Sequence, residues 1–395
     1  MSAWSPQFRM QIALSPPKER PRRRIAVVWT NFGPYHLARI RALAQYFRVL
    51  AIELAAFERL YGWQTDKSEI GAEMYTMREG DWEDQRQLSV AASLWRKLNA
   101  LQPDAILVPG YATAPAIAAA LWGKLHNART VLMSESNAAD HQRRDVLEIA
   151  KKLLVKTLFD CAVVGGKRAQ EYACELGIRQ TAIGIGYDVV DNDFFASRAE
   201  KERLLSGQNP PSCGSAYFLY VGRLAQEKNL SGLIEAFASY RARGGDWQLV
   251  VVGDGFLRDE LTLLARARLV SEHVVFAGHR AVAELAAFYA RAGCFVLPSL
   301  REPWGLVVNE AMASGLPVIV SNHCGCSDDL VQEGDNGFVF DPSNRARLTE
   351  LLSHMSSLSV PERARMSSRS SEIIGRYSPA LWAKEVYRIV SSSRN

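Results

Sequence analysis

The chain has 395 residues, which is more than one ordinary hydrophobic core can use, so its length favours two domains. Hydrophobic residues make up 48% and charged residues 23%, close to the soluble globular average, and no stretch supplies the roughly 20 apolar residues that a membrane-spanning helix requires. The formal net charge is +5, and residues 1–60 hold ten Lys and Arg against three Asp and Glu. This basic end would suit an anionic membrane surface or an acidic acceptor, and a solvated basic face explains it equally well.

Residues 1–23 are predicted to be a basic flexible tail, because they lack a periodic apolar pattern and end in a basic run. Gln and Arg interrupt the apolar stretch of the tail, so no secretory signal is expected and the chain should be cytoplasmic. The six cysteines lack the CxxC pairs typical of a zinc site and are predicted to be reduced thiols. They are Cys161, Cys174, Cys213, Cys294, Cys324 and Cys326.

The first part of the chain alternates short apolar runs with helical patterns. Residues 24–30 form a β-rich run that leads through the turn NFGP into the helical pattern HLARIRALAQYF. Further apolar runs follow at 48–54, 105–110, 130–136 and 161–166. Strands separated by helices predict a parallel sheet covered on both faces, and we place this first α/β domain at 24–196.

The same alternation begins again at residues 216–224 and continues through a second set of apolar runs. These lie at 247–255, 273–278, 294–299, 317–321 and 337–341. We therefore expect a second α/β domain at 216–376, joined to the first by a polar, Gly- and Pro-containing linker at 197–215. In open α/β sheets ligands bind outside the carboxyl ends of the strands, so the cleft between the two domains is the expected site.

The segment VGRLAQEKN, residues 221–229, has the pattern of a phosphate site. A strand ends at Gly222, and Arg223 and Lys228 follow it just before the next helix. A planar guanidinium, a mobile ammonium and the N–H groups of a helix N-terminus together suit a diphosphate. A surface loop with two solvated cations is the alternative.

The segment 298–321 holds Glu302 and Glu310, with seven residues between them. Glu302 follows a strand, Gly305 permits close backbone approach, and VVNEAMA has the composition of a helix. Carboxylates at two depths of one site can accept hydrogen bonds from sugar hydroxyls. In isolation Glu310 would equally suit an acid that favours the dipole of a helix N-terminus.

Together with VVGDG, with FAG before His279 and with AMASGLPVI, these segments resemble the retaining family 4 glycosyltransferases of GT-B fold. The resemblance covers nearly all of residues 216–341 and implies an α/β fold of two Rossmann-like domains facing a central cleft. It also implies that the last segment, 377–395, forms a helix that returns to the N-terminal, acceptor-binding domain.

The resemblance implies a role for each matched residue. Arg223 and Lys228 would bind the donor diphosphate and stabilise the leaving group. Glu310 would hold the ribose, and Glu302 would contact the transferred sugar. The remaining donor contacts would come from Gly33, Gly222, Gly253, Phe276, Gly278, His279, Gly305, Leu306 and Val307.

The acceptor side matches the family less closely. His36 is a candidate for orienting the acceptor or a phosphate, although it would also suit a cap or packing residue of the first helix. The family often has a histidine at the end of a central strand, where this chain has Glu135 instead. Glu135 is a candidate catalytic residue with His141 nearby, and a helix cap is the other interpretation.

The implied activity is transfer of a sugar from a nucleotide diphosphate sugar to an acceptor hydroxyl with retention, in polysaccharide, lipopolysaccharide or glycolipid assembly. The acceptor would be a glycan, a lipid-linked molecule or a small molecule. No metal, cofactor or nucleic acid is expected. The basic helical pattern at 143–158 suggests a peripheral contact with an anionic membrane at its inner face. Two alternatives stay open, a non-catalytic nucleotide-sugar binding protein and a GT-B epimerase or phosphorylase.

Overall fold

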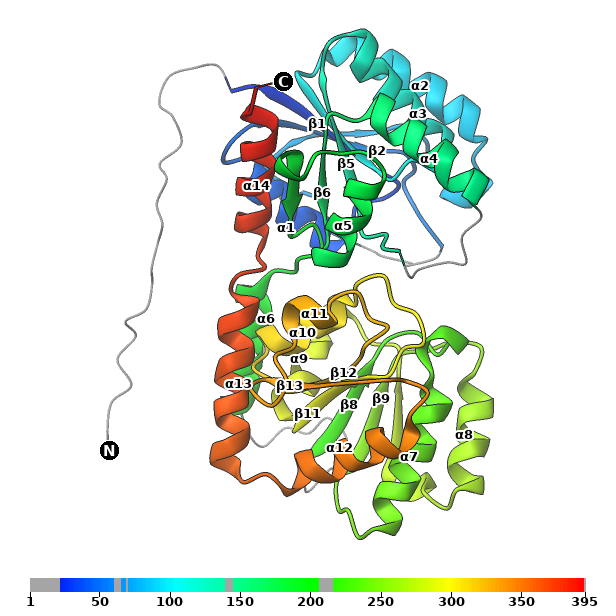
Figure 1. Cartoon of the computed structure of the whole chain (residues 1–395), viewed down its shortest axis with the longest axis vertical. Coiled ribbons are helices and arrows are strands. Elements are labelled where there is room, and N and C mark those ends of the chain that lie inside the picture. Colours follow the sequence, from blue (N-terminus) through cyan, green and yellow to red (C-terminus); the bar gives the residue numbers. More distant parts are fainter. Residues whose placement is uncertain (1–21, 60–64, 69, 139–144, 206–215, 394–395) are drawn as a thin grey trace, which may run out of the picture.

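The computed structural model describes residues 22–59, 65–68, 70–138, 145–205 and 216–393. It contains two parallel β-sheets, one above the other, each with helices packed on it (Figure 1). Most of the predicted basic tail lies outside the described residues. Each sheet has its own hydrophobic core, so the α/β class and the pair of Rossmann-like domains are confirmed.

The first sheet has seven strands in the order β3-β2-β1-β4-β5-β6-β7, all of them parallel. Their bounds are β1 Arg24–Trp29, β2 Arg48–Glu53, β3 Glu73–Thr76, β4 Ala105–Pro109, β5 Arg129–Ser134, β6 Cys161–Val164 and β7 Ile183–Ile185. The five inner strands coincide with the predicted apolar runs. The two edge strands were not predicted, because β3 and β7 are short and pair on one side only, so they lack the continuous apolar run of a buried strand.

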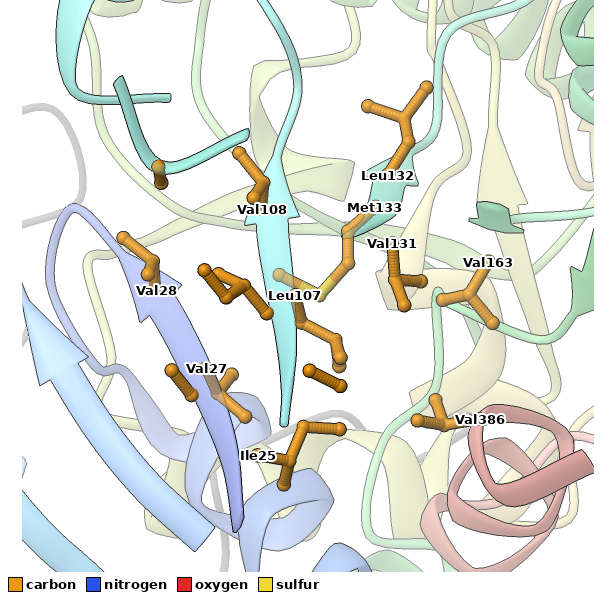
Figure 2. Close-up of a cluster of buried hydrophobic side chains, with 14 of the residues drawn as sticks. Ile25, Val27, Val28, Leu107, Val108, Val131, Leu132, Met133, Val163 and Val386 are labelled. Carbon is orange, nitrogen blue, oxygen red and sulfur yellow. The ribbon is translucent and has the colours of Figure 1, made fainter. Parts of the chain in front are cut away.

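Helices α1 Pro34–Leu43, α2 Gln87–Leu101, α3 Ala114–Leu125, α4 Asp145–Leu158 and α5 Lys167–Glu175 belong to the first sheet. Branched side chains of neighbouring strands meet in its core, among them Val27 of β1 and Leu107 of β4 (Figure 2). Val386 reaches the same core from the far end of the chain, on the last helix, α14 Pro379–Ser391. The expected return of the chain end to the first domain is therefore seen in the packing.

The second sheet has six strands in the order β10-β9-β8-β11-β12-β13. Their bounds are β8 Tyr217–Val221, β9 Gln248–Val252, β10 Val274–Gly278, β11 Cys294–Leu297, β12 Val318–Ser321 and β13 Gly337–Phe340. The helices of this half are α6 Asn192–Leu204, α7 Leu230–Ala242, α8 Arg258–Ala267, α9 Val282–Arg291, α10 Leu306–Ala313, α11 Ser327–Leu330, α12 Arg345–Ser357 and α13 Val360–Ile374. All six strands coincide with predicted runs.

The expected linker differs from the structure in its first part, since residues 197–204 are helical and complete α6. Phe195 of this helix lies in the second core together with Val190, so the chain enters the second half before the predicted boundary at 196. The polar surface of α6 explains the error. Its many Lys, Arg and Glu residues suggest a loop in the sequence, because the second core on which the helix packs is not visible there. Residues 206–215 lie outside the described residues.

Candidate functional site

A cavity of about 1050 Å³ lies between the two domains and is lined by residues of both. The carboxyl ends of β1 and β5 border it from the first domain, and those of β8, β9 and β11 border it from the second. This is the crevice where open parallel sheets bind ligands. Its volume is at the upper end of the range for ligand sites, which leaves room for two substrates.

Arg223 and Lys228 both border this cavity, on the loop between β8 and α7. Arg223 is about half exposed, and its Nη2 lies 3.3 Å from Oε1 of Glu227. Lys228 ends a short 3-10 turn, and its ammonium forms an ion pair with the Glu302 carboxylate. The side chains of this pair are 13% and 14% exposed. The loop thus presents one half-exposed cation beside Glu227 and one largely buried cation held against Glu302.

The N-terminus of α10 also borders the cavity. Gly305 precedes the helix with φ = 105°, a left-handed conformation that strains other residue types, and Leu306 and Val307 follow it along the cavity wall. The first N–H groups of a helix lack partners within the helix and attract anions. Residues 305–307 therefore lie where they could contribute to a phosphate or sugar site, as the sequence predicts.

Glu310 is buried inside this helix and accepts hydrogen bonds from two tyrosines. Tyr289 Oη lies 2.8 Å from Oε2, and Tyr35 Oη, from the opposite domain, lies 2.5 Å from Oε1. Burial raises the pKa of Glu310 to about 7, although both tyrosine hydrogen bonds act to lower it. Glu310 is not in the first turn of α10, so the helix-dipole alternative is wrong.

The other predicted donor contacts divide into two groups. Gly222, Gly253 and His279 border the cavity, as expected. Among the described residues, the cavity lining does not include Phe276, Gly278 or Gly33. Phe276 and Gly278 lie in β10, where the Gly278 carbonyl accepts a hydrogen bond from the Gly253 N–H at 2.9 Å, so they support the wall from behind.

On the acceptor side, His36 and Glu135 both border the cavity, and His141 lies outside the described residues. His36 also has the alternative role predicted for it, because its Nδ1 accepts a hydrogen bond from the Gly33 N–H at 2.9 Å at the start of α1. Burial, reinforced by the charge of Arg39, holds the pKa of His36 well below its usual range. His36 is therefore neutral at physiological pH.

The sequence did not predict many of the residues around the cavity, and four of them determine its charge and hydrogen bonding. Arg39 and Asp188 are buried ionisable residues in the cavity wall, and Tyr35 and Tyr289 donate hydrogen bonds to Glu310. A weak signal existed for Arg39, which lies between the apolar residues Ala38 and Ile40 in the helical pattern. No local signal marks Tyr289, because a tyrosine on an amphipathic helix is ordinarily a packing residue.

Within the part of the chain that the structure describes, no group of three His, Cys, Asp or Glu side chains is placed to hold a metal ion. The expectation that no metal or cofactor is needed stays a prediction. No described helix has both the length and the apolar composition needed to cross a bilayer.

Comparisons with known proteins agree with this architecture. The family model of glycosyl transferases group 1 matches residues 203–372. The chain is 38% identical to glycogen synthase of Mycobacterium tuberculosis over 138 residues. This aligned segment covers 35% of this chain and 33% of that protein. Over 170 residues it is 31% identical to alpha-monoglucosyldiacylglycerol synthase of Acholeplasma laidlawii, 43% of this chain and 40% of that protein. These matches thus span between a third and a half of each relative.

Among solved structures, the chain resembles HepE of Anabaena, crystallised in complex with UDP. The TM-score is 0.72 at 18% sequence identity, and the match covers 92% of this chain and 98% of HepE. At this identity the likeness establishes the shared fold. Together with the family model matched to residues 203–372 and the cavity between two Rossmann-like domains, it shows a chain of GT-B fold whose second domain matches the glycosyl transferases group 1.

Proposed function

We propose that this protein transfers a sugar from a nucleoside diphosphate sugar to an acceptor hydroxyl with retention of the anomeric configuration. The observation that carries the proposal is the meeting of Arg223, the Lys228–Glu302 pair and the N-terminus of α10 on one side of the cavity. Retention is what the resemblance of the second domain to the retaining family 4 glycosyltransferases implies. A polysaccharide, lipopolysaccharide or glycolipid is the product class that we favour.

In this reaction the bond between the anomeric carbon and the phosphate oxygen breaks, and a bond to the acceptor oxygen forms. The acceptor hydroxyl would give its proton to the leaving diphosphate. Negative charge develops on the leaving phosphate and positive charge on the sugar ring. Arg223, Lys228 and the N–H groups of α10 would stabilise the phosphate, because fixed donors in a partly closed site need little reorganisation. The Glu302 carboxylate would face the sugar hydroxyls, and Glu310 would accept hydrogen bonds from the ribose.

Titration calorimetry with UDP, GDP and ADP tests the donor site. We expect one nucleotide to bind the wild type, and Arg223→Ala to weaken its binding by about tenfold or more, since a charge-assisted phosphate contact is lost. Arg243→Ala removes an exposed arginine of the same domain that does not border the cavity, and it should leave the affinity unchanged. Equal binding by all three proteins would contradict the assignment.

Slow hydrolysis of the matching nucleotide sugar tests the chemistry without knowledge of the acceptor. Proton NMR should show the released sugar first in the anomeric configuration of the donor, before mutarotation. The rate should be the same in EDTA as in magnesium if no divalent ion takes part. Persistent nucleotide binding with no hydrolysis or transfer would instead support a non-catalytic binding protein.

We also propose that the acceptor is presented at an anionic membrane surface, on a face formed by α3 and α4. Ile117, Leu121 and Leu125 follow one another at helical spacing on α3 and are exposed. The exposed apolar side chains of α4 are Leu147, Ile149 and Leu153, and Lys152 and Lys156 are exposed on the same helix. Apolar side chains beside lysines favour insertion into the headgroup region of anionic lipid.

Vesicle sedimentation tests this face. Binding to vesicles with phosphatidylglycerol should exceed binding to neutral phosphatidylcholine vesicles and should fall strongly in the double variant Leu121→Gln/Leu153→Gln. The control Leu263→Gln changes an exposed leucine of α8 in the other domain and should bind as the wild type does. Equal binding of all variants would exclude the α3–α4 face.

A further inference from the structure

The wall of the cavity formed by the first domain contains a buried arginine, two of whose guanidinium nitrogens have no hydrogen-bond partner among the described residues. Arg39 lies on α1, is only 2% exposed and borders the cavity. Its Nε and Nη1 atoms are buried, and neither has a hydrogen-bond partner among the residues that the structure describes. A buried guanidinium with unsatisfied N–H groups is costly, so this position is unusual for a residue that only fills space.

Two aromatic rings fix the position of Arg39. Its guanidinium carbon lies 4.8 Å from the centre of the Tyr187 ring and 5.5 Å from that of Trp29. The Trp29 indole N–H donates a hydrogen bond to the Tyr187 hydroxyl at 3.2 Å, which orients both rings. Cation–π contacts stabilise the charge, and they leave the N–H donors of the guanidinium available to a ligand.

Two carboxyl groups, those of Asp188 and Glu135, border the same wall of the cavity as Arg39. No ion pair between Arg39 and Asp188 is present in the described structure. Burial, followed by the charge of Glu135, raises the pKa of Asp188 well above its usual range, although Arg39 opposes this shift. His36 is neutral, as described above. Arg39 is thus a permanent cation next to a carboxyl group that tends to keep its proton.

We propose that Arg39 is the centre of an oxyanion subsite on the acceptor side of the cavity, and that the acceptor carries a carboxylate or a phosphate near the hydroxyl that receives the sugar. The planar guanidinium offers a fork of N–H donors that matches either group. Arg223 and Lys228 lie on the opposite domain, where they serve the donor diphosphate. This subsite rests on the proposed transfer function and names the class of acceptor that it would use.

Saturation-transfer NMR with glucuronate, glucose 6-phosphate and glucose tests the subsite, with and without UDP. We expect the two anionic sugars to bind the wild type about tenfold or more tightly than glucose, because a charge-assisted hydrogen bond is gained. Arg39→Gln should abolish this preference and leave UDP affinity unchanged. Arg41→Gln, an exposed arginine of the same helix, should behave as the wild type does.

Two results would overturn the proposal. In the first, the wild type binds glucose as well as its anionic counterparts. In the second, Arg39→Gln weakens UDP binding, which would assign the oxyanion to the donor phosphates instead of the acceptor. Failure of UDP, GDP and ADP alike to bind the wild type is a different result, because it contradicts the transfer function. An Arg39-dependent preference for anionic sugars, measured without a nucleotide, would still stand.

A stability measurement guards against misfolded variants. Arg39→Met replaces the unpaired guanidinium with an apolar side chain of similar length, and we expect its thermal unfolding temperature to equal or exceed that of the wild type. A large drop in that temperature would show that the guanidinium is needed for folding, which contradicts a role in ligand binding alone.

Discussion

Tyr35 and Glu310 join the two domains across the cavity, with the tyrosine hydroxyl donating a hydrogen bond to the carboxylate at 2.5 Å. Tyr289 donates to the second oxygen of the same carboxylate, at 2.8 Å, from within the domain of Glu310. Both tyrosine hydroxyls lie where the hydroxyls of a ribose would have to lie in order to donate hydrogen bonds to Glu310. A ribose that binds Glu310 therefore has to replace at least one tyrosine, and Tyr35 is the partner that domain opening would remove.

The raised pKa of Glu310 predicts how stability depends on pH. The folded state holds the proton with a pKa of about 7, against an ordinary value of 4.5, so ionisation costs folded stability as pH rises between these values. Glu310→Gln stays neutral throughout. We expect the free energy of unfolding of Glu310→Gln, relative to wild type, to increase by up to about 3 kcal/mol between acidic and mildly alkaline pH.

Urea denaturation at a series of pH values measures this difference. The control is Glu284→Gln, at an exposed glutamate of the same domain. Its stability relative to the wild type should not change between pH 4.5 and about 7. A constant difference between wild type and Glu310→Gln across this range would mean that folding does not raise the pKa of Glu310.

The two cations of the predicted phosphate loop should differ in their effect on stability. Lys228→Ala leaves the largely buried Glu302 carboxylate without its ammonium, and we expect a loss of about 2 kcal/mol. Arg223 is about half exposed, and Arg223→Ala should change stability by no more than about 0.5 kcal/mol. Thermal and urea unfolding measure both. Lys228→Met/Glu302→Gln should recover part of the loss, and equal losses for the two single variants would contradict this ranking.

Gly253 should tolerate no side chain. Its φ is 136°, and an added Cβ would lie 1.9 Å from the Gly222 carbonyl oxygen, so Gly253→Ala must displace the backbone of the cavity wall. Gly334 also has a positive φ, 75°, with nothing within 4 Å of the added atom, so Gly334→Ala reports the conformational strain alone. We expect about 1 kcal/mol for Gly334→Ala and clearly more for Gly253→Ala by urea denaturation. Similar losses would show that the wall can move.

Arg168 should limit the separation of the domains. From the N-terminus of α5 it donates to both carboxylate oxygens of Asp328, at 2.6 and 2.8 Å, and to the Asn322 carbonyl at 2.8 Å. Arg168→Ala should increase the radius of gyration of the ligand-free protein in X-ray scattering. Arg369 has the same exposure, 27%, and pairs with acids of its own domain, so Arg369→Ala should leave the radius unchanged. Equal radii for both variants would mean that other contacts hold the domains.

The sequence predicted the inner strands of both sheets, and the donor loop that it named borders the cavity. Buried parallel strands are continuous apolar runs, and the segment around Arg223 and Lys228 places its chemistry within a few residues of one strand end. The contact between Tyr35 and Glu310 could not be predicted from the sequence. The two residues are 275 positions apart, and their contact depends on how the domains face each other. The burial of Arg39 likewise depends on Tyr187, which lies in the loop after β7, 148 residues further along the chain.

The return of α14 to the first domain has a consequence for the order in which the chain can fold during its synthesis. Trp382 and Val386 are fully buried in the first core, yet they leave the ribosome after the whole second domain. A newly made first domain therefore exposes the groove that α14 covers while the second domain completes its own core. Folding from the N-terminal end, which is usual for proteins with several domains, is interrupted here. The first domain therefore begins to fold first and completes its core last.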